Sequence, residues 1–533
     1  MKKIIAILFL HVFCVGLTFA QKDEEENEKD IKTSQGVTIT KSNPYEVVDS
    51  RFKTYYATEN GIVAIKMVGK TYSEYMFQVF TGDKLNETAR KTAPVFEEKF
   101  NKMHYSPLGF YRVEKSIFLF YSLYDKPNTT ERFFAREVDI ENGGFAGKAI
   151  KLIEVHEKIN SFMGTGKFSM DISEDRTKFV VRFRYIDEKK NGKENKLKYG
   201  MAVFNSSLEK LWQEDVNIPY TEEMSDIEDF TVDSKGNGYF LIKKYDKAIN
   251  RKTISDADNV TMEILEVNDD GKDKIREFKI ADNLIRSIVL KENGNGDIVC
   301  AGYYSKPKSR AIDGVFCTIL SKSGDFSTPT MSEFSIDFIK EYAKLSERKE
   351  KKLKEKDDEG DLGMNFLTMR KIHNLKDGGL MLIGEIYYVT TSTDSKGNTR
   401  TTYHYDDVIL TKINASGEVE WMKKIPKRST SSTFRSFVSD NFVYISLRDN
   451  LKNQNLRKDQ NPLGGNSAVV LYKIDLNEGD HEYKILFSSN NIDGTPVHQF
   501  YLDRIIPLTE NKFAVELYIK GKKDMMFQVE FDE

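Results

Sequence analysis

The sequence predicts an all-β fold, a β-propeller built from four-stranded blades. The main observation is a strand–tight turn–strand unit that recurs about eight times at intervals of roughly sixty residues, a period typical of propeller blades. Its clearest copy begins at Asp377-Gly378-Gly379 and continues through two apolar runs, 380–388 and 408–413. The 35 Phe and 26 Tyr favour strands, because flat side chains suit pleated surfaces. Eight blades is the favoured count and seven is the alternative.

Each predicted blade has a central hairpin of two apolar strands bounded by turn residues. The eight hairpins, in chain order, are 62–68 with 75–80, 117–124 with 132–140, 179–185 with 201–204, 239–245 with 261–267, 298–304 with 315–320, 380–388 with 408–413, 442–447 with 468–474, and 513–519 with 525–531. A short strand-like segment, 37–40, precedes the first unit, and the sequence ends after the third strand of the last one. We therefore expect the N-terminal strand to complete the last blade and close the ring.

The first twenty residues have the composition of a signal peptide. Lys2 and Lys3 precede an apolar run that ends at Ala20, and this run is too short to cross a membrane stably. The mature protein is therefore expected in the periplasm or outside the cell, as in Gram-negative bacteria, with no transmembrane segment. The expected organisation is a signal peptide at 1–20, a disordered acidic leader at 21–35 and the propeller at 36–533.

The predicted loops differ between the two faces of the ring. Chain direction alternates within a blade, so the second-to-third loops and the interblade connections share one face, where the loops are long. The largest insertion, 331–364, lies between two blades on that face and has apolar residues at helical spacing, which predicts a short helix followed by a charged segment. Insertions confined to one face indicate a binding surface on a constant scaffold.

Two segments resemble the blade signature of quinoprotein-type propellers, in which a turn Gly precedes a Trp. One contains Gly417 and Trp421; the other ends at Trp212 and lacks the Gly. The resemblance implies that each Trp packs on the next blade. The arrangement is also similar to secreted propeller proteins of unknown function in Gram-negative bacteria. Quinoprotein enzymes carry adjacent paired cysteines, which this sequence lacks, so no cofactor is expected.

Charge and cysteine content further limit the classes of function that are expected. The net charge of −3 gives no concentrated basic surface, so a nucleic-acid partner is not expected. Cys300 and Cys317 fall on consecutive strands of one unit, where they form either a cross-strand disulfide or two buried thiols. The histidines are scattered singly without metal-ligand spacing, so no metal site is expected.

A recurrent Tyr near the end of the second strand is the first candidate binding feature. Exposed Tyr offers a flat stacking surface and a hydroxyl, suited to sugars or peptides, whereas interblade packing is the alternative role. The members of this set are Tyr124, Tyr185, Tyr245, Tyr304 and Tyr388.

A long hairpin at 385–407 is the second candidate. Aromatic residues near its base and Thr near its tip suit a contact arm, and folding over the central channel is the alternative. Its candidate binding residues are Tyr387, Tyr388, Arg400, Tyr403, His404 and Tyr405.

These features favour a non-enzymatic binding or scaffold propeller that recognises a protein or glycan partner on its long-loop face. The alternatives are a structural envelope protein that contacts its own copies, a degenerate quinoprotein-like protein, and an enzyme that cleaves glycans. Glycan cleavage needs two carboxylates that face each other. The acidic residues beside the tyrosines, from which such a pair would come, are Asp125, Asp187, Asp246 and Glu385.

Overall fold

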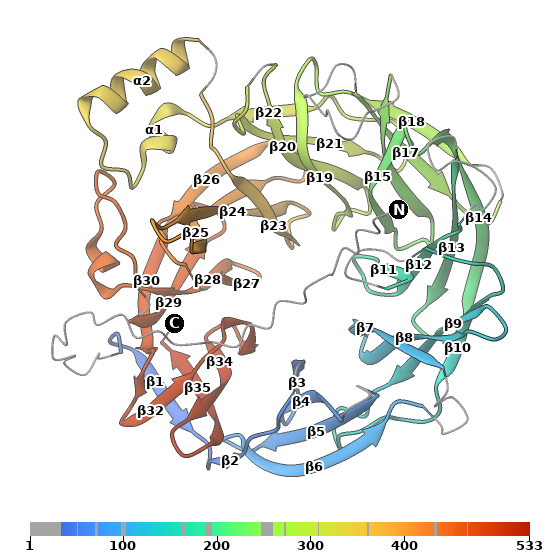
Figure 1. The fold of residues 1–533 in the computed structure, drawn as a ribbon, viewed down its shortest axis with the longest axis horizontal. Helices are drawn as coiled ribbons and strands as arrows, with labels where there is room; N and C mark the ends of the chain where they lie inside the picture. The colour runs from blue at the N-terminus through green and yellow to red at the C-terminus, as the bar shows by residue number, and fades with distance from the viewer. Residues whose placement is uncertain are drawn as a thin grey trace.

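The chain forms a ring of β-sheets in a computed structural model (Figure 1). The predicted signal peptide and residues 21–32 of the leader lie outside the described residues. The structure describes residues 33–50, 52–69, 73–96, 103–160, 166–186, 195–246, 260–270, 273–307, 309–359, 362–430, 434–465 and 467–532. Within them, no helix combines the length and the apolar character that crossing a membrane requires.

Seven of the sheets are four-stranded blades, numbered 1 to 7 in chain order. The first strands, nearest the ring centre, are β3 (Lys53–Thr58), β7 (His104–Val113), β11 (Phe168–Ile172), β15 (Ser225–Val232), β19 (Leu284–Glu292), β23 (Leu367–Asn374) and β27 (Phe434–Val438). The second strands are β4 (Gly61–Val68), β8 (Ser116–Asp125), β12 (Lys178–Arg184), β16 (Gly238–Tyr245), β20 (Ile298–Ser305), β24 (Leu380–Thr393) and β28 (Phe442–Asp449).

The outer half of each blade completes an antiparallel sheet. The third strands are β5 (Glu74–Thr81), β9 (Thr130–Glu137), β13 (Lys196–Asn205), β17 (Val260–Val267), β21 (Gly314–Leu320), β25 (Thr399–Ile413) and β29 (Ala468–Asp475). The fourth strands are β6 (Asn86–Pro94), β10 (Ile150–Val155), β14 (Lys210–Thr221), β18 (Lys274–Phe278), β22 (Thr330–Glu333), β26 (Val419–Ile425) and β30 (His481–Ser488).

A larger seven-stranded sheet, called the closing sheet here, joins the two ends of the described chain. Its N-terminal strand, β1, pairs antiparallel with β35. The strands of the closing sheet are β1 (Val37–Lys41), β2 (Tyr45–Glu46), β31 (Asn491–Ile492), β32 (Thr495–Gln499), β33 (Ile505–Thr509), β34 (Lys512–Ile519) and β35 (Lys523–Phe531).

The blade count is therefore corrected. Among the described residues the four-stranded blades number seven, the alternative count, and the favoured count of eight was wrong. The eighth predicted hairpin is present as β34 and β35, but β31, β32 and β2 enlarge its sheet beyond four strands. Turn signals alone could not predict this, because the extra strands are only two to five residues long.

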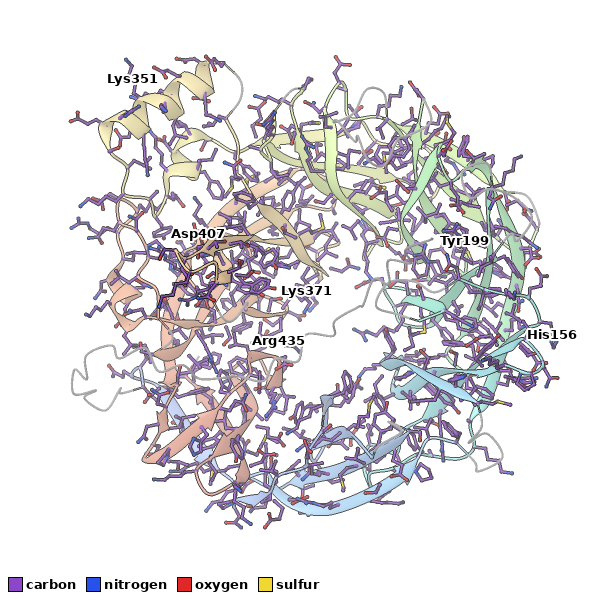
Figure 2. All side chains as sticks on the ribbon, in the orientation of Figure 1. His156, Tyr199, Lys351, Lys371, Asp407 and Arg435 are labelled. Atoms are coloured by element: carbon purple, nitrogen blue, oxygen red, sulfur yellow. The ribbon has the colours of Figure 1, made fainter. Side chains whose placement is uncertain are left out.

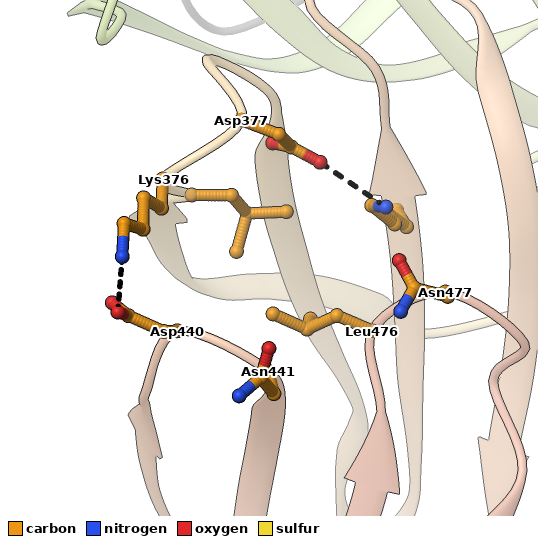
Figure 3. Close-up of a pocket in the computed structure, with 8 residues that line it drawn as sticks. Lys376, Asp377, Asp440, Asn441, Leu476 and Asn477 are labelled. Atoms are coloured by element: carbon orange, nitrogen blue, oxygen red, sulfur yellow. Dashed lines mark hydrogen bonds and ion pairs between the residues drawn. The ribbon is translucent and has the colours of Figure 1, made fainter.

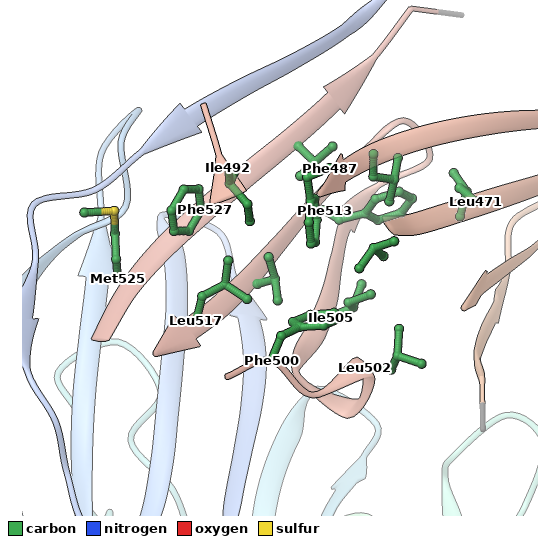
Figure 4. Close-up of a cluster of buried hydrophobic side chains, with 14 of the residues drawn as sticks. Leu471, Phe487, Ile492, Phe500, Leu502, Ile505, Phe513, Leu517, Met525 and Phe527 are labelled. Carbon is green, nitrogen blue, oxygen red and sulfur yellow. The ribbon is translucent and has the colours of Figure 1, made fainter. Parts of the chain in front are cut away.

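The sheets are held together by apolar side chains packed between neighbouring sheets. Between blade 7 and the closing sheet, Leu471 and Phe487 pack with Phe513 and Phe527 (Figure 4). Burial of one such side chain contributes about 1.5–3 kcal/mol. The second strands lie at the middle of this packing, which is why their sequences are nearly continuous apolar runs.

Tight turns and the two tryptophans fix neighbouring blades to each other. Gly378 and Gly417 adopt φ values of 82° and 88°, which favour glycine in these short turns. Trp421 donates from Nε1 to the carbonyl of Leu476 in blade 7, at 3.0 Å. Trp212 donates likewise to the carbonyl of Gly236 in blade 4, at 2.7 Å. Each Trp thus reaches the next blade along the chain.

The insertion between blades 5 and 6 lies at the outer edge of the ring in Figure 1. Its first helix, α1 (Ile336–Lys340), is shorter than the apolar spacing suggested, because Tyr342 takes a left-handed φ of 58°. The charged helix α2 (Glu347–Asp358) buries none of its side chains. Two 3₁₀ turns, η2 (Leu451–Asn455) and η3 (Leu502–Arg504), lie in the loop between β28 and β29 and ahead of β33, respectively.

Candidate functional site

The second and third strands of blade 6 continue beyond β23 and β26 as a two-stranded ribbon, defined here as residues 387–405. The ribbon ends in a turn in which Asp394 Oδ1 accepts hydrogen bonds from the backbone N–H groups of Lys396 and Asn398. Its cross-strand pairs include Tyr387 with Tyr405, Tyr388 with His404, Val389 with Tyr403, and Ser392 with Arg400. Cross-strand partners share a face, so the predicted aromatic residues sort onto two faces.

One face carries two exposed apolar side chains above a tyrosine pair. The rings of Tyr387 and Tyr405 lie 5.1 Å apart at the base. Farther out, Val389 and Tyr403 are each 45% exposed. This face presents apolar surface to solvent where the rest of the blade buries it. Arg400, opposite Ser392, belongs to the other face and is exposed near the tip.

The opposite face carries a stack of three rings. The imidazole of His404 lies 4.4 Å from the ring of Tyr388 with an interplanar angle of 8°. The ring of Phe366, which precedes β23, lies 5.3 Å from that of Tyr388 with an interplanar angle of 32°, and Phe366 is 63% exposed. His404 Nε2 also lies 2.9 Å from Thr390 Oγ1. The stack keeps the base of the ribbon flat and its outermost ring accessible.

A buried ion-pair network lies at the root of the ribbon. Glu385 is fully buried, and its Oε1 lies 2.7 Å from Lys427 Nζ. Its Oε2 accepts a hydrogen bond from Nε of Arg370, at 2.9 Å. The two cations also face the base tyrosines, with the Arg370 guanidinium 4.9 Å from the Tyr387 ring and Lys427 Nζ 5.6 Å from the Tyr405 ring. The network fixes the ribbon to the first strand of its own blade.

Two further carboxyl groups beneath the ribbon are shifted toward their neutral form. Burial raises the pKa of Asp407 to about 6, although the nearby Lys424 ammonium and the backbone N–H of Lys427 oppose the shift. Burial likewise raises the pKa of Asp449 to about 6, against hydrogen bonds from Asn453 and Asn450.

The insertion is attached beside this root. Lys424 Nζ donates to the carbonyls of Ile339 and Glu341 at 3.0 and 3.2 Å, and lies 5.3 Å from the Phe338 ring. A cation at the C-terminal end of a helix is favourable, because the unpaired carbonyls there carry partial negative charge. The insertion also donates a backbone hydrogen bond to blade 7, from Tyr342 N to Lys458 O at 2.7 Å. It therefore buttresses the outer edge next to the ribbon.

The remaining predicted tyrosines lie in separate blades, one in each of blades 2 to 5. Tyr124 lies 3.8 Å from Lys167 Nζ, and Tyr304 is 1% exposed inside blade 5. The hydroxyl of Tyr185 donates to Asp215 at 2.8 Å, and that of Tyr245 donates to Asp226 at 2.9 Å. These four residues lie in four blades. Their binding role stays a prediction.

The acidic residues considered for glycan cleavage are dispersed in the same way. Asp125 is paired with Arg132 in blade 2, at 3.3 Å, while Glu385 is buried in blade 6. Asp246 follows β16, and Asp187 lies outside the described residues. Within the described part of the chain, no three His, Cys, Asp or Glu side chains are grouped as metal ligands would be.

The cross-strand disulfide that the sequence allowed is not formed. Cys300 is opposite Thr318 and Cys317 is opposite Ala301 in the β20–β21 register. This one-residue offset places the two side chains on opposite faces of the sheet. Both are free and buried, and burial raises the pKa of the Cys317 thiol to about 12.

A set of buried glutamate–lysine pairs near the long-loop face was missed from the sequence. In each pair, an almost fully buried Glu on the second or third strand of a sheet forms an ion pair with a Lys ammonium group. The pairs are Glu131 with Lys167 at 2.8 Å, Glu263 with Lys244 at 2.8 Å, Glu385 with Lys427 at 2.7 Å, and Glu516 with Lys66 at 2.5 Å. The available signal was a lone acid within an apolar strand, as at Glu263 and Glu516.

A small hollow of about 240 Å³ opens on the opposite, short-turn face between blades 6 and 7 (Figure 3). Its charged rim is internally paired: Lys376 with Asp440, and Lys412 with Asp377 at 3.2 Å. Leu375 and Leu476 form its apolar wall. The hollow is therefore separate from the ribbon and offers no uncompensated charge.

Comparison with known proteins finds solved structures of low similarity. No family model and no curated protein sequence matches the chain. The propeller domain of the Trilobed protease from Pyrococcus furiosus is 11% identical, with 84% of this chain and 98% of that one covered and a TM-score of 0.35. A Penicillium chrysogenum α-L-arabinanase is 10% identical, with 70% and 94% covered and a TM-score of 0.31.

A prolyl endopeptidase structure is 9% identical, with 90% of this chain covered and a TM-score of 0.37. The chain spans 55% of the length of that protein. None of these similarities assigns a ligand or an activity to this chain.

Proposed function

We propose that this protein is an exported propeller that binds a protein or glycan partner through its long-loop face, with the ribbon of blade 6 as the contact arm. The observation that carries the proposal is the placement of Val389, Tyr403 and Phe366. Each of the three is 45% or more exposed, and all lie on or beside one projecting hairpin. Tyr and Phe anchors of this kind contribute much of the binding energy in protein interfaces.

The distribution of other exposed apolar residues supports the same face. Ile186 follows the second strand of blade 3, Leu463 lies in the second-to-third loop of blade 7, and Phe52 lies in the connection from β2 to β3. In a four-stranded blade these three positions lie on the long-loop side. Tyr501 lies just ahead of β33 in the closing sheet. Scattered exposed apolar residues are ordinary, but a concentration on one face indicates an interaction surface.

The rigid root of the ribbon supports binding rather than passive protrusion. The Arg370–Glu385–Lys427 network and the Tyr388–His404 stack hold the base in one arrangement. A pre-ordered arm loses less conformational entropy when it meets its partner, so more of the contact energy becomes affinity. The same arrangement would serve an aromatic platform for a sugar ring, since both need flat, immobile rings.

A photo-crosslinking pair tests the proposal. One variant carries a photoreactive phenylalanine at Tyr403, and the matched control carries it at Ile275, which is 43% exposed at the start of β18 on the short-turn face. Irradiation in a cell-envelope fraction should give a discrete adduct with the Tyr403 probe alone. For a glycan partner, wild-type protein should bind on a glycan array and Tyr403→Ala should not. Identical adducts at both positions, together with an unchanged array profile, would refute the ribbon as the contact arm.

A further inference from the structure

Two cationic side chains lie on the innermost strands of neighbouring blades. Lys371 lies on β23 of blade 6 and Arg435 lies on β27 of blade 7, and both point toward the inner edge of the ring in Figure 2. Lys371 Nζ donates to the carbonyl of Ser436 at 3.3 Å. The hydroxyl of the same residue lies 3.0 Å from His373 Nε2. Lys371 and His373 of blade 6 thus both contact Ser436 of blade 7, the residue after Arg435.

These cations differ from the other lysines held within the ring. Lys66, Lys244 and Lys427 each lie within 2.8 Å of a glutamate oxygen. Among the ion pairs of the described chain, none involves Lys371 or Arg435. The carboxylate that favours the charged form of Arg435 is Asp503 of η3, which lies beyond ion-pair distance.

The electrostatics of this cluster disfavour positive charge, and the Asp503 carboxylate offsets the effect for Arg435. Lys371 is exposed, and local desolvation together with the neighbouring Arg435 lowers its pKa to about 8. Burial, with Lys371 and Arg435, lowers the pKa of His373 to about 3, so the imidazole is neutral at pH 7. Nε of Arg435 is buried and has no hydrogen-bond partner. An N–H donor in this state is costly unless an acceptor reaches it.

We propose that the inner wall between blades 6 and 7 is a binding site for an oxyanion, the carboxylate or phosphate group of a ligand that enters the ring, held by Lys371 and Arg435. The Arg435 guanidinium supplies directional donors in a fixed fork, and the Lys371 ammonium supplies a compact charge. The neutral imidazole of His373 adds a polar partner without a third charge. An anion between the two cations removes their mutual repulsion and gives charge-assisted hydrogen bonds to both. This site is distinct from the ribbon and does not depend on it.

Calorimetric titration at fixed ionic strength tests the site with two probes, inorganic phosphate and glucuronate. Wild-type protein should bind at least one of them, and the probe that binds distinguishes phosphate from carboxylate recognition. Lys371→Met should weaken that binding at least tenfold, and so should Arg435→Met. The matched control is Lys376→Met, which removes one positive charge from the same blade but from a lysine already paired with Asp440. It should bind like wild type.

Thermal unfolding of each variant shows that it is folded before it is titrated. Because Lys371 is repelled by its surroundings, Lys371→Met should unfold no earlier than wild type, so lost binding cannot be attributed to a lost fold. The proposal is overturned if wild type binds neither probe. It is equally overturned if Lys371→Met and Lys376→Met bind with equal affinity.

Discussion

Lys427 and Glu385 form a buried ion pair at the root of the ribbon, with Nζ 2.7 Å from Oε1 and neither side chain more than 1% exposed. The pair joins the segment after β26 to the second strand of blade 6. A buried ion pair contributes little net stability over an apolar pair, but removal of one partner leaves a bare charge in the interior. Its main effect is therefore to fix the direction in which the ribbon leaves the blade.

Glu385→Gln should destabilise the protein by about 3–5 kcal/mol, because the Lys427 ammonium stays buried without its counter-charge. Urea unfolding measures this change. The double variant Glu385→Leu/Lys427→Met should recover most of the loss, since it removes both charges together. A loss below about 1 kcal/mol in the single variant would place water or another anion beside Lys427.

The closing sheet contains two carboxylates with opposite expected effects. Burial raises the pKa of Glu516, but Lys66, Lys53 and the Tyr55 hydroxyl outweigh burial and hold it well below the usual value. Burial, and then the adjacent Glu516, raise the pKa of Asp524.

A carboxyl group whose pKa is lower in the folded than in the unfolded protein stabilises the fold at pH values above its unfolded pKa. This contribution to stability is lost as the pH falls from the unfolded pKa through the folded pKa. Glu516→Gln should therefore destabilise at pH 7, and its deficit relative to wild type should shrink below pH 4.5, the ordinary value. Asp524→Asn should instead raise the stability of the protein at pH 7, because the charged form of Asp524 is disfavoured in the folded state. Thermal unfolding from pH 3 to pH 7 measures both, and equal losses in the two variants would contradict this assignment.

Lys371 gives a second pH dependence. Its folded pKa of about 8 lies below the ordinary value of 10.5, so the unfolded chain binds more protons between these two pH values. Between these two pH values, the free energy of unfolding of wild type should therefore rise relative to that of Lys371→Met. The difference between their melting temperatures at pH 7 and pH 10 measures the effect. A flat difference would mean that Lys371 titrates normally.

Cys300 and Cys317 give a direct check of the β20–β21 register. The third cysteine, Cys14, lies in the predicted signal peptide, so intact mass of a chain that begins at Gln21, under non-reducing conditions, should show two free thiols. A maleimide should modify them only after denaturation, because both are buried and burial raises their pKa values. A mass lower by two hydrogens would show that Cys300 and Cys317 are bridged.

The fold was largely predictable because its central hairpins are continuous apolar runs with regular turns. Every predicted hairpin, from 62–68 with 75–80 to the last, coincides with a strand pair of the structure. The first strands were harder to place, since charged residues such as Arg370, Lys371 and Arg435 break the apolar pattern.

The candidate site was predictable only in part. The sequence placed Tyr387, Tyr388, His404 and Tyr405 on one hairpin, and the structure brings these residues together at its base. Sequence spacing did not reveal their support, because Lys427 reaches Glu385 from 42 residues away. Sequence spacing also did not show how far apart the other predicted tyrosines lie. A shared position within each blade does not bring side chains of different blades together.

The affinity of a partner captured through Tyr403 is the most direct test of the ribbon as the contact arm. The measurement compares wild type with Tyr403→Ala/Val389→Ser and with the short-turn-face control Ile275→Ser. Loss of two exposed anchors should weaken binding at least tenfold, about 1.4 kcal/mol or more, while the control binds like wild type. Equal affinity for all three proteins would contradict the account.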